Sequence, residues 1–186
     1  MEVKFQETAN PGPLGLVGFG LTTILLNLHN AGFFALDASI LSMGIFVGGL
    51  MQVIVGIFEW KKNNMFGMMA FTSYGFFWIS LVALILMPNL ELSKSVSSVS
   101  MGWYLIVWAL FTFGLFIVTL KMNTTMKILF ALLLILFILL AIGDFSGIRI
   151  IKIIAGFDGI ICGLTAIYLA FAQLINHEYD KIILPI

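Results

Sequence analysis

The sequence predicts an all-α integral membrane protein with six transmembrane helices. Of its 186 residues, 61% are hydrophobic and 10% are charged, whereas about 25% of the residues are charged in a typical soluble domain. The mean hydropathy is +1.14, and a soluble fold of this composition would leave much apolar surface in water. Charges and turn residues divide the chain into six apolar stretches, each near the roughly 20 residues that cross a bilayer.

Short segments separate the six spans, so we expect a single transmembrane domain over residues 1–186 with no extramembrane domain. The spans are expected near residues 13–35, 38–60, 65–87, 101–120, 126–143 and 150–175. The segments between them read ALDAS, WKKNN, MPNLELSKSVSSVS, KMNTT and GDFSGIR. The N-terminus, MEVKFQETA, has no basic region followed by a short apolar run, so we expect no cleavable signal peptide and interpret the first span as the insertion signal.

Lysine and arginine are unevenly divided between the two ends of the predicted bundle. With six spans, both termini and the second and fourth connections share one side. That side carries Lys4, Lys61, Lys62, Lys121, Lys127 and Lys181, and the opposite side carries Lys94, Arg149 and Lys152. The positive-inside rule therefore predicts that both termini lie in the cytoplasm. We expect a multi-pass protein of the plasma (inner) membrane. Its two three-helix halves would be inverted relative to each other, as in many transporters, although no sequence repeat relates them.

The first span, from Asn10 to Phe34, combines a helix start with a line of polar residues. Prolines suit a first helical turn, so we expect the helix to begin near Pro13 with Asn10 as its N-cap. A step of 100° per residue places Gly15, Phe19, Thr22, Leu26, His29 and Asn30 on one face. The opposite face is wholly apolar. In lipid the polar face should turn toward protein or water, which predicts a solute path.

Small residues recur along the second and sixth spans. Gly44, Gly48, Gln52 and Gly56 line one face of the second span, and the sixth span carries Gly156, Gly159, Gly163, Ala166 and Ala170, followed by Gln173. Either these stripes allow close helix packing, or they leave room for a narrow solute path. Under the second alternative, Gln52 and Ala166 would face the solute. The polar residues that we expect along the path are Asn10, Thr22, His29, Asn30 and Gln52.

Three single side chains have two interpretations each. Tyr74, in the middle of the third span, is either a core residue bonded to a neighbouring carbonyl or a donor to a passing carboxylate or amide. His29 is either a rim residue or part of a proton-linked step, because histidine is the side chain that titrates near neutral pH. Asp158 either lies near the outer membrane surface or meets a neighbouring protomer, since an aspartate facing lipid costs roughly 2.5–3.5 kcal/mol.

No motif for enzyme chemistry or for a cofactor is present in the sequence. It has no HExxH, GxSxG or P-loop, and no cluster of histidines and carboxylates at metal-ligand spacing. Its one cysteine, Cys162, excludes a disulfide framework and a cysteine metal cluster, and no basic run suggests nucleic acid. We therefore expect a protein that is not an enzyme and that binds no cofactor, no metal ion and no nucleic acid.

Six segments occur in register along nearly the whole chain: NPGPLGL, GFGLTTILLNLHN, ALD, FTSYG, LLAIG and CG..AIYLA. Together they resemble the acetate uptake transporter family, most closely the bacterial succinate-acetate permeases, whose signature is NPAPLGL; here Gly12 replaces the alanine. The resemblance implies a six-helix protomer, assembled in membrane lipid as a homohexamer with one path per protomer. It also implies transport of acetate and related small carboxylates, with succinate possible, either coupled to protons or in channel-like fashion.

The resemblance assigns roles to four residues. The family builds a hydrophobic constriction from a phenylalanine, a tyrosine and a leucine, and these positions fall on Phe19, Tyr74 and Leu133. A selectivity position at a small residue of the last span falls on Ala166.

The distribution of charge agrees with a small carboxylic acid as the solute. No lysine or arginine lies in mid-span, so a carboxylate in the path would rely on hydroxyl and amide donors. A protonated acid would avoid most of the cost of burying a charge. Two other classes stay open: a urea or short-amide channel of similar six-helix, hexameric type, and a non-transporting scaffold or acetate sensor.

Overall fold

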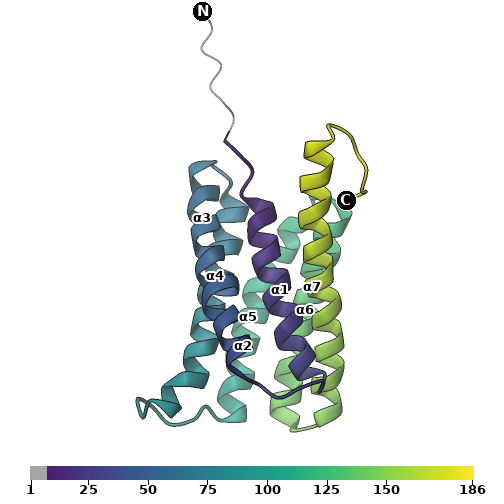
Figure 1. Cartoon of the computed structure of the whole chain (residues 1–186). Helices are drawn as coiled ribbons and strands as arrows, with labels where there is room; N and C mark the ends of the chain where they lie inside the picture. The colour runs from purple at the N-terminus through teal and green to yellow at the C-terminus, as the bar shows by residue number, and fades with distance from the viewer. Residues whose placement is uncertain (1–7) are drawn as a thin grey trace, which may run out of the picture.

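The computed structural model describes residues 8–186 and forms a bundle of helical rods (Figure 1). The second rod is continuous from Ala38 to Lys61 and contains three helical segments. The elements are α1 (Gly12–Asn30), α2 (Ala38–Ser42), η1 (Met43–Met51), α3 (Gln52–Lys61), α4 (Met65–Asn89), α5 (Ser98–Thr119), α6 (Thr124–Ser146) and α7 (Arg149–Glu178). Six rods are long and apolar enough to cross a membrane, which confirms the predicted fold class.

The start of α1 and the end of α7 lie at the same end of the bundle, the upper end in Figure 1. The connections from α4 to α5 and from α6 to α7 lie at the opposite end. The cytoplasmic location of the termini and the inverted relation of the two halves stay predictions. Lys4, which contributes to the charge bias, lies outside the described residues.

Side-chain caps fix the starts of four of the six rods. Each capping side chain accepts a hydrogen bond from a backbone N–H in the first turn of its helix. The caps are Asp37 for α2, Asn64 for α4, Ser97 for α5 and Asn123 for α6. Hydrogen bonds from the hydroxyl and the backbone N–H of Ser39 hold the pKa of Asp37 below its usual range.

Both ends of the first helix differ from the prediction. α1 begins at Gly12 with Pro11 at the N-cap position, so the assignment of Asn10 as the N-cap is wrong by one residue. The Asn10 side chain still accepts a hydrogen bond from the Gly12 N–H at 3.2 Å. The helix ends at Asn30 rather than near residue 35, because the chain turns at Gly32, whose φ of +93° favours glycine.

The second rod contains a π-helical stretch, η1, that the sequence did not predict. A π turn holds more residues than an α turn, so the glycine stripe does not follow a regular spacing of four. The glycines nevertheless allow close packing. A Cβ on Gly48 would lie 2.8 Å from side-chain atoms of Thr22 and of Trp78, and one on Gly44 would lie 2.6 Å from Val82. The stripe therefore packs the second rod against α1 and α4.

The glycines of α7 bring that helix close to α1. A Cβ on Gly156 would lie 2.3 Å from the backbone nitrogen of Ala31, and one on Gly163 would lie 2.8 Å from the carbonyl oxygen of Gly20. A Cβ on Gly159 would lie 2.2 Å from Cγ of Asn27. Of the two alternatives for the stripes, helix packing is the one that these glycines serve.

Substitution of Gly163 should destabilise the bundle, because the atoms that an added methyl group would meet include backbone that cannot move aside. We expect Gly163→Ala to lower the free energy of unfolding by about 1–3 kcal/mol, the usual cost of overpacking. Gly114→Ala in α5 is the matched control, since nothing lies within 4 Å of its Cβ position. Thermal unfolding in detergent measures the effect, and equal midpoints for the two variants would contradict this account of the α1–α7 contact.

Candidate functional site: two cavities that meet at one constriction

A cavity of about 250 Å³, here called cavity 1, lies at the end of the bundle where α1 begins. Much of its wall is apolar and comes from α1, α4 and α6. Its polar wall consists of Asn10, Gln52, Glu59, Asn64, Tyr74 and Gln173. No lysine, arginine or histidine is among the described residues that line it.

A second cavity of about 200 Å³, cavity 2, lies toward the other end of the bundle. Its wall is formed by the second half of α1 together with parts of α4, α5, α6 and α7. The side chains with polar atoms on this wall are Thr23, Asn27, His29, Asn30, Trp78, Asp144 and Lys152.

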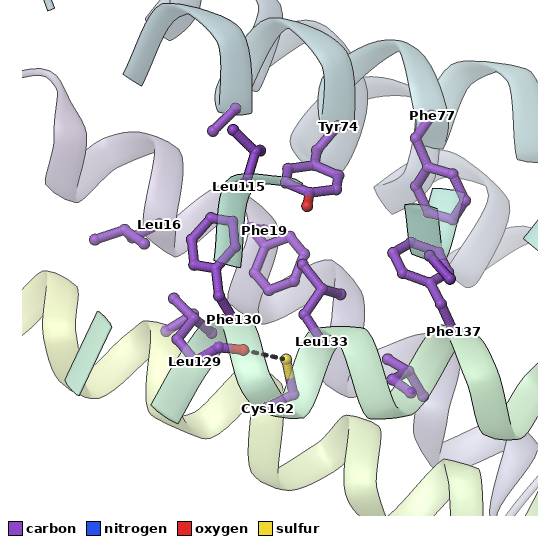
Figure 2. Close-up of a cluster of buried hydrophobic side chains, with 14 of the residues drawn as sticks. Leu16, Phe19, Tyr74, Phe77, Leu115, Leu129, Phe130, Leu133, Phe137 and Cys162 are labelled. Atoms are coloured by element: carbon purple, nitrogen blue, oxygen red, sulfur yellow. Dashed lines mark hydrogen bonds between the residues drawn. The ribbon is translucent and has the colours of Figure 1, made fainter. Parts of the chain in front are cut away.

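Two residues, Phe19 of α1 and Leu133 of α6, line both cavities. Their side chains are buried, with exposed fractions of 6% and 3%. Tyr74 of α4 lines cavity 1 beside them, with its ring centre 6.1 Å from that of Phe19. Figure 2 shows the three side chains facing one another from separate helices. The structure thus brings the predicted constriction trio together at the level where the two cavities meet.

A hydrogen bond and several aromatic contacts fix the position of Tyr74. The Thr112 hydroxyl donates its one proton to the Trp108 carbonyl oxygen at 2.8 Å. The Tyr74 hydroxyl is therefore the donor in its 2.9 Å hydrogen bond with Thr112 Oγ1. Phe111 packs edge-on against the Tyr74 ring at a centroid distance of 5.5 Å. The buried phenol has a hydroxyl partner rather than the carbonyl partner considered from the sequence.

Polar atoms without a partner among the described residues occur on both sides of the constriction. In cavity 1, Gln52 donates from Nε2 to the Gly15 carbonyl oxygen at 3.4 Å, and its Oε1 is buried and unpaired. In cavity 2, the Thr23 hydroxyl and the Trp78 indole nitrogen are buried and unpaired. A buried polar group without a partner costs about 1–3 kcal/mol. These atoms are thus available to a polar solute.

The remaining predicted path residues divide into two groups. Asn10 and Gln52 line cavity 1, while His29 and Asn30 line cavity 2. Thr22 lines neither cavity, because it lies on the side of α1 that packs against the second rod and its hydroxyl donates to the Gly18 carbonyl oxygen. The structure places the adjacent Thr23 on the wall of cavity 2 instead.

Ala166 also lies off both cavity walls, wholly buried in the same apolar cluster as Leu133 and Cys162. It therefore makes no direct contact with a solute in either cavity. Asp158 of α7 is half-buried, lines neither cavity and has one buried carboxylate oxygen without a partner among the described residues.

Sequence reasoning did not single out Glu59 as a residue of the path. Its side chain is 2% exposed, lines cavity 1 and accepts a hydrogen bond from Asn64 Nδ2 at 2.8 Å. The signal was present in the spacing, because Gln52, Gly56 and Glu59 are four and three residues apart and therefore share a helix face. The adjacent tryptophan and lysines made the segment resemble an interfacial end.

Asn27 was missed for a similar reason. It is 2% exposed, donates to the Thr23 carbonyl oxygen at 2.9 Å and accepts from Asn30 Nδ2 at 3.0 Å. Thr23 and Asn27 are four residues apart along α1 and each lies one residue after a member of the line that we chose, which already included Asn30. Two polar residues four apart in an apolar helix were the usable signal.

Side chains that could hold a metal ion do not gather anywhere in residues 8–186: no three of His, Cys, Asp or Glu come together. The helical bundle instead presents two cavities that are partly polar and are separated by a short apolar barrier. This arrangement defines a membrane protein that passes a small solute, either a channel or a transporter.

A family model described as the GPR1/FUN34/yaaH family matches residues 1–186, and the chain belongs to this family. The resemblance drawn from the sequence motifs is thereby confirmed. The succinate-acetate/proton symporter SatP of Escherichia coli (strain K12) is 52% identical over 180 residues, covering 97% of this chain and 96% of the relative. Acetate permease A of Emericella nidulans is 31% identical over 204 residues, covering 99% of this chain and 67% of the relative.

The fold is also similar to a solved structure of the bacterial acetate channel SatP. The TM-score is 0.96 at 51% sequence identity, and the match covers 97% of this chain and 99% of that chain.

Proposed function

We propose that this protein moves acetate and related small carboxylates, succinate among them, across the plasma (inner) membrane. The observation that carries the proposal is that Phe19 and Leu133 line both cavities, so one narrow apolar step separates two partly polar compartments. The relatives support the substrate class, since one is named a succinate-acetate/proton symporter and another an acetate permease. A urea or short-amide channel is the alternative that the experiments below also test.

The constriction favours a solute that crosses with a proton. Carboxylic acids have ordinary pKa values near 4, so about one molecule in a thousand is neutral at pH 7. An isolated carboxylate in an apolar environment costs far more than its neutral acid. The rings of Phe19 and Tyr74 and the side chain of Leu133 give the solute no charged partner at this level. The neutral acid is thus the form that meets the lowest energy barrier at the apolar constriction.

We assign the exchange of this proton in cavity 1 to Glu59. Its carboxyl is the one acidic group among the described residues that line this cavity, and it is almost completely buried. An ionised Glu59 would repel an acetate anion, whereas a proton shared between the two carboxyl groups removes the repulsion. In cavity 2, His29 is the counterpart. Its Nδ1 lies 2.9 Å from the Phe34 carbonyl oxygen, which leaves Nε2 free to take up a proton.

Each protomer of the proposed homohexamer carries its own path, because both cavities lie within one chain. Membrane lipid and neighbouring protomers would cover the apolar outer surface, on which Phe46, Leu110 and Ile161 are more than half exposed. Ala166 lines neither cavity, so a role in selectivity would be exerted through the packing of Leu133 rather than by contact with the solute.

Uptake of labelled acetate and labelled urea into the same proteoliposomes tests the proposed function. We expect acetate to enter and urea to remain near the protein-free background. Because the neutral acid is the species that crosses, a pH gradient with the acidic side outside should increase the initial rate. Urea flux in the absence of acetate flux would favour the urea or short-amide channel. An acetate flux that does not depend on the pH gradient would exclude obligatory proton coupling.

Replacement of Glu59 distinguishes the exchange of the proton from the passage of acetate through the protein. Glu59→Gln keeps the size of the side chain and its hydrogen bond with Asn64 but cannot exchange a proton. We expect the stimulation of uptake by the pH gradient to fall to near unity, while exchange of labelled for unlabelled acetate continues. Glu59→Asp is the matched control and should keep most of the stimulation. Full stimulation in Glu59→Gln would show that another group carries the proton.

A further inference from the structure

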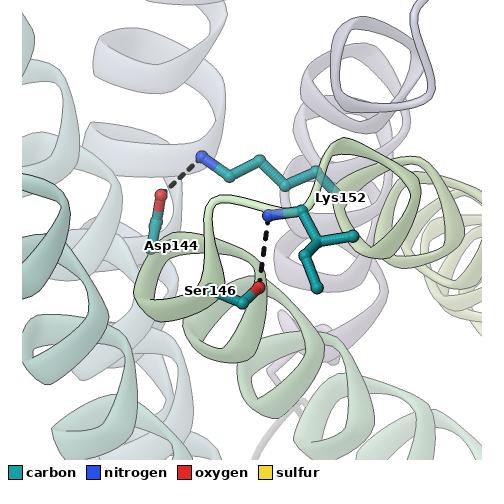
Figure 3. Close-up of polar contacts among 4 residues, drawn as sticks. Asp144, Ser146 and Lys152 are labelled. Carbon is teal, nitrogen blue, oxygen red and sulfur yellow. Dashed lines mark hydrogen bonds and ion pairs between the residues drawn. The ribbon is translucent and has the colours of Figure 1, made fainter.

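An ion pair lies on the wall of cavity 2. Lys152 of α7 donates from Nζ to Oδ1 of Asp144 on α6 at 2.5 Å (Figure 3). Asp144 is the more buried partner, with 12% of its side chain exposed, and Lys152 is 45% exposed. Within residues 8–186 this is the one ion pair, and both side chains line cavity 2.

The local structure does not need this pair for its own stability. Gly147, at a φ of +68°, ends α6, and the Ile148 N–H donates to the Ser146 hydroxyl, so the turn between α6 and α7 is already fixed. An ion pair with one exposed partner typically contributes between zero and about 1 kcal/mol.

The Lys152 side chain also crosses α6 at a defined position. A Cβ on Gly143 would lie 2.8 Å from Cγ of Lys152, so the lysine stem crosses α6 where that helix has no side chain. The ammonium group thereby reaches the cavity wall, and the stem remains packed against the helix.

Lys152 is the one lysine or arginine among the described residues that line either of the two cavities. The other ionisable groups on the wall of cavity 2 are Asp144 on α6 and His29 on α1; the parts of α4 and α5 that face this cavity contribute none. Apart from His29, the wall therefore carries one cation and one anion. An incoming carboxylate can contact the exposed side of the ammonium group, and Asp144 competes with it for the same partner.

We propose that Lys152 is a recruitment site for carboxylate anions at cavity 2 and that Asp144 is its internal competitor. The inference rests on the proposed function and deepens it. The solute arrives as the abundant anion, takes the place of Asp144 beside the ammonium group, and leaves again when it gains a proton and moves toward the constriction. Competition from Asp144 keeps the anion weakly held, as passage requires.

Initial rates of acetate transport test this site in right-side-out and inside-out vesicles, so that each face is measured separately. Lys152→Gln should raise the KM about fivefold, the effect of losing about 1 kcal/mol of charge attraction in water, with little change in kcat. Asp144→Asn should lower the KM, and the double variant should lie between the wild type and Lys152→Gln. The changes in KM should all be observed on one face of the membrane only. They should also become smaller in 1 M salt, which screens charges beyond about 3 Å.

Arg149→Gln is the matched control. It removes the same charge from the first residue of the same helix, at an exposed position that lines neither cavity, and its KM should equal that of the wild type. Elution of each variant as the wild-type species in size-exclusion chromatography shows that it is folded.

The outcomes separate the two proposals. An unchanged KM in Lys152→Gln, or a lower melting temperature without any KM shift, would overturn the recruitment site while wild-type acetate transport stands. Equal shifts in Lys152→Gln and Arg149→Gln would also overturn it, because surface charge in general would then be responsible. An absence of acetate transport in the wild type would overturn the proposed function, and the recruitment site with it.

Discussion

The close approach of α1 to α7 determines where the solute path can run. Glycines at positions 156, 159 and 163 remove the side chains that would hold the two helices apart, and α1 settles against α7 along most of its length. The side of α1 that faces away from this contact then turns toward α4 and α6. Phe19 meets Tyr74 and Leu133 there because the helix contact behind it is fixed. A wider spacing between α1 and α7 would move Phe19 and change the constriction.

The walls of the path are partly polar at its two ends and apolar in its middle, and this difference determines which form of a solute can cross. Both cavities offer amide and hydroxyl groups, cavity 2 also offers the Trp78 indole, and some of these atoms have no partner among the described residues. At Phe19 and Leu133 the walls are apolar, so a charge loses its solvation there and gains nothing in return. An acid that binds as an anion at one end and crosses as a neutral molecule meets both conditions. Glu59 and His29 lie in different cavities, one on each side of the apolar step.

Much of the fold could be predicted because a lipid environment permits few backbone structures. A chain with six apolar stretches separated by short polar segments has to satisfy its backbone hydrogen bonds within helices. The constriction trio was predicted from family motifs, and the structure brings these three residues together. The π-helical segment η1 and the off-path position of Thr22 could not be predicted, since both depend on how neighbouring helices pack. A difference of one residue turns a side chain by about 100°, which is why Thr23 and Asn27 face cavity 2 and Thr22 does not.

The central claim is that solute crosses at the contact between Phe19 and Leu133, and chemical blockage of this point tests it most directly. Leu133→Cys introduces a thiol there, and the wild type is the control because its one cysteine, Cys162, is wholly buried. Acetate flux should fall toward the protein-free background when the new thiol reacts with a small methanethiosulfonate, and it should return after reduction. Complete modification of residue 133 with unchanged flux would show that the path lies elsewhere.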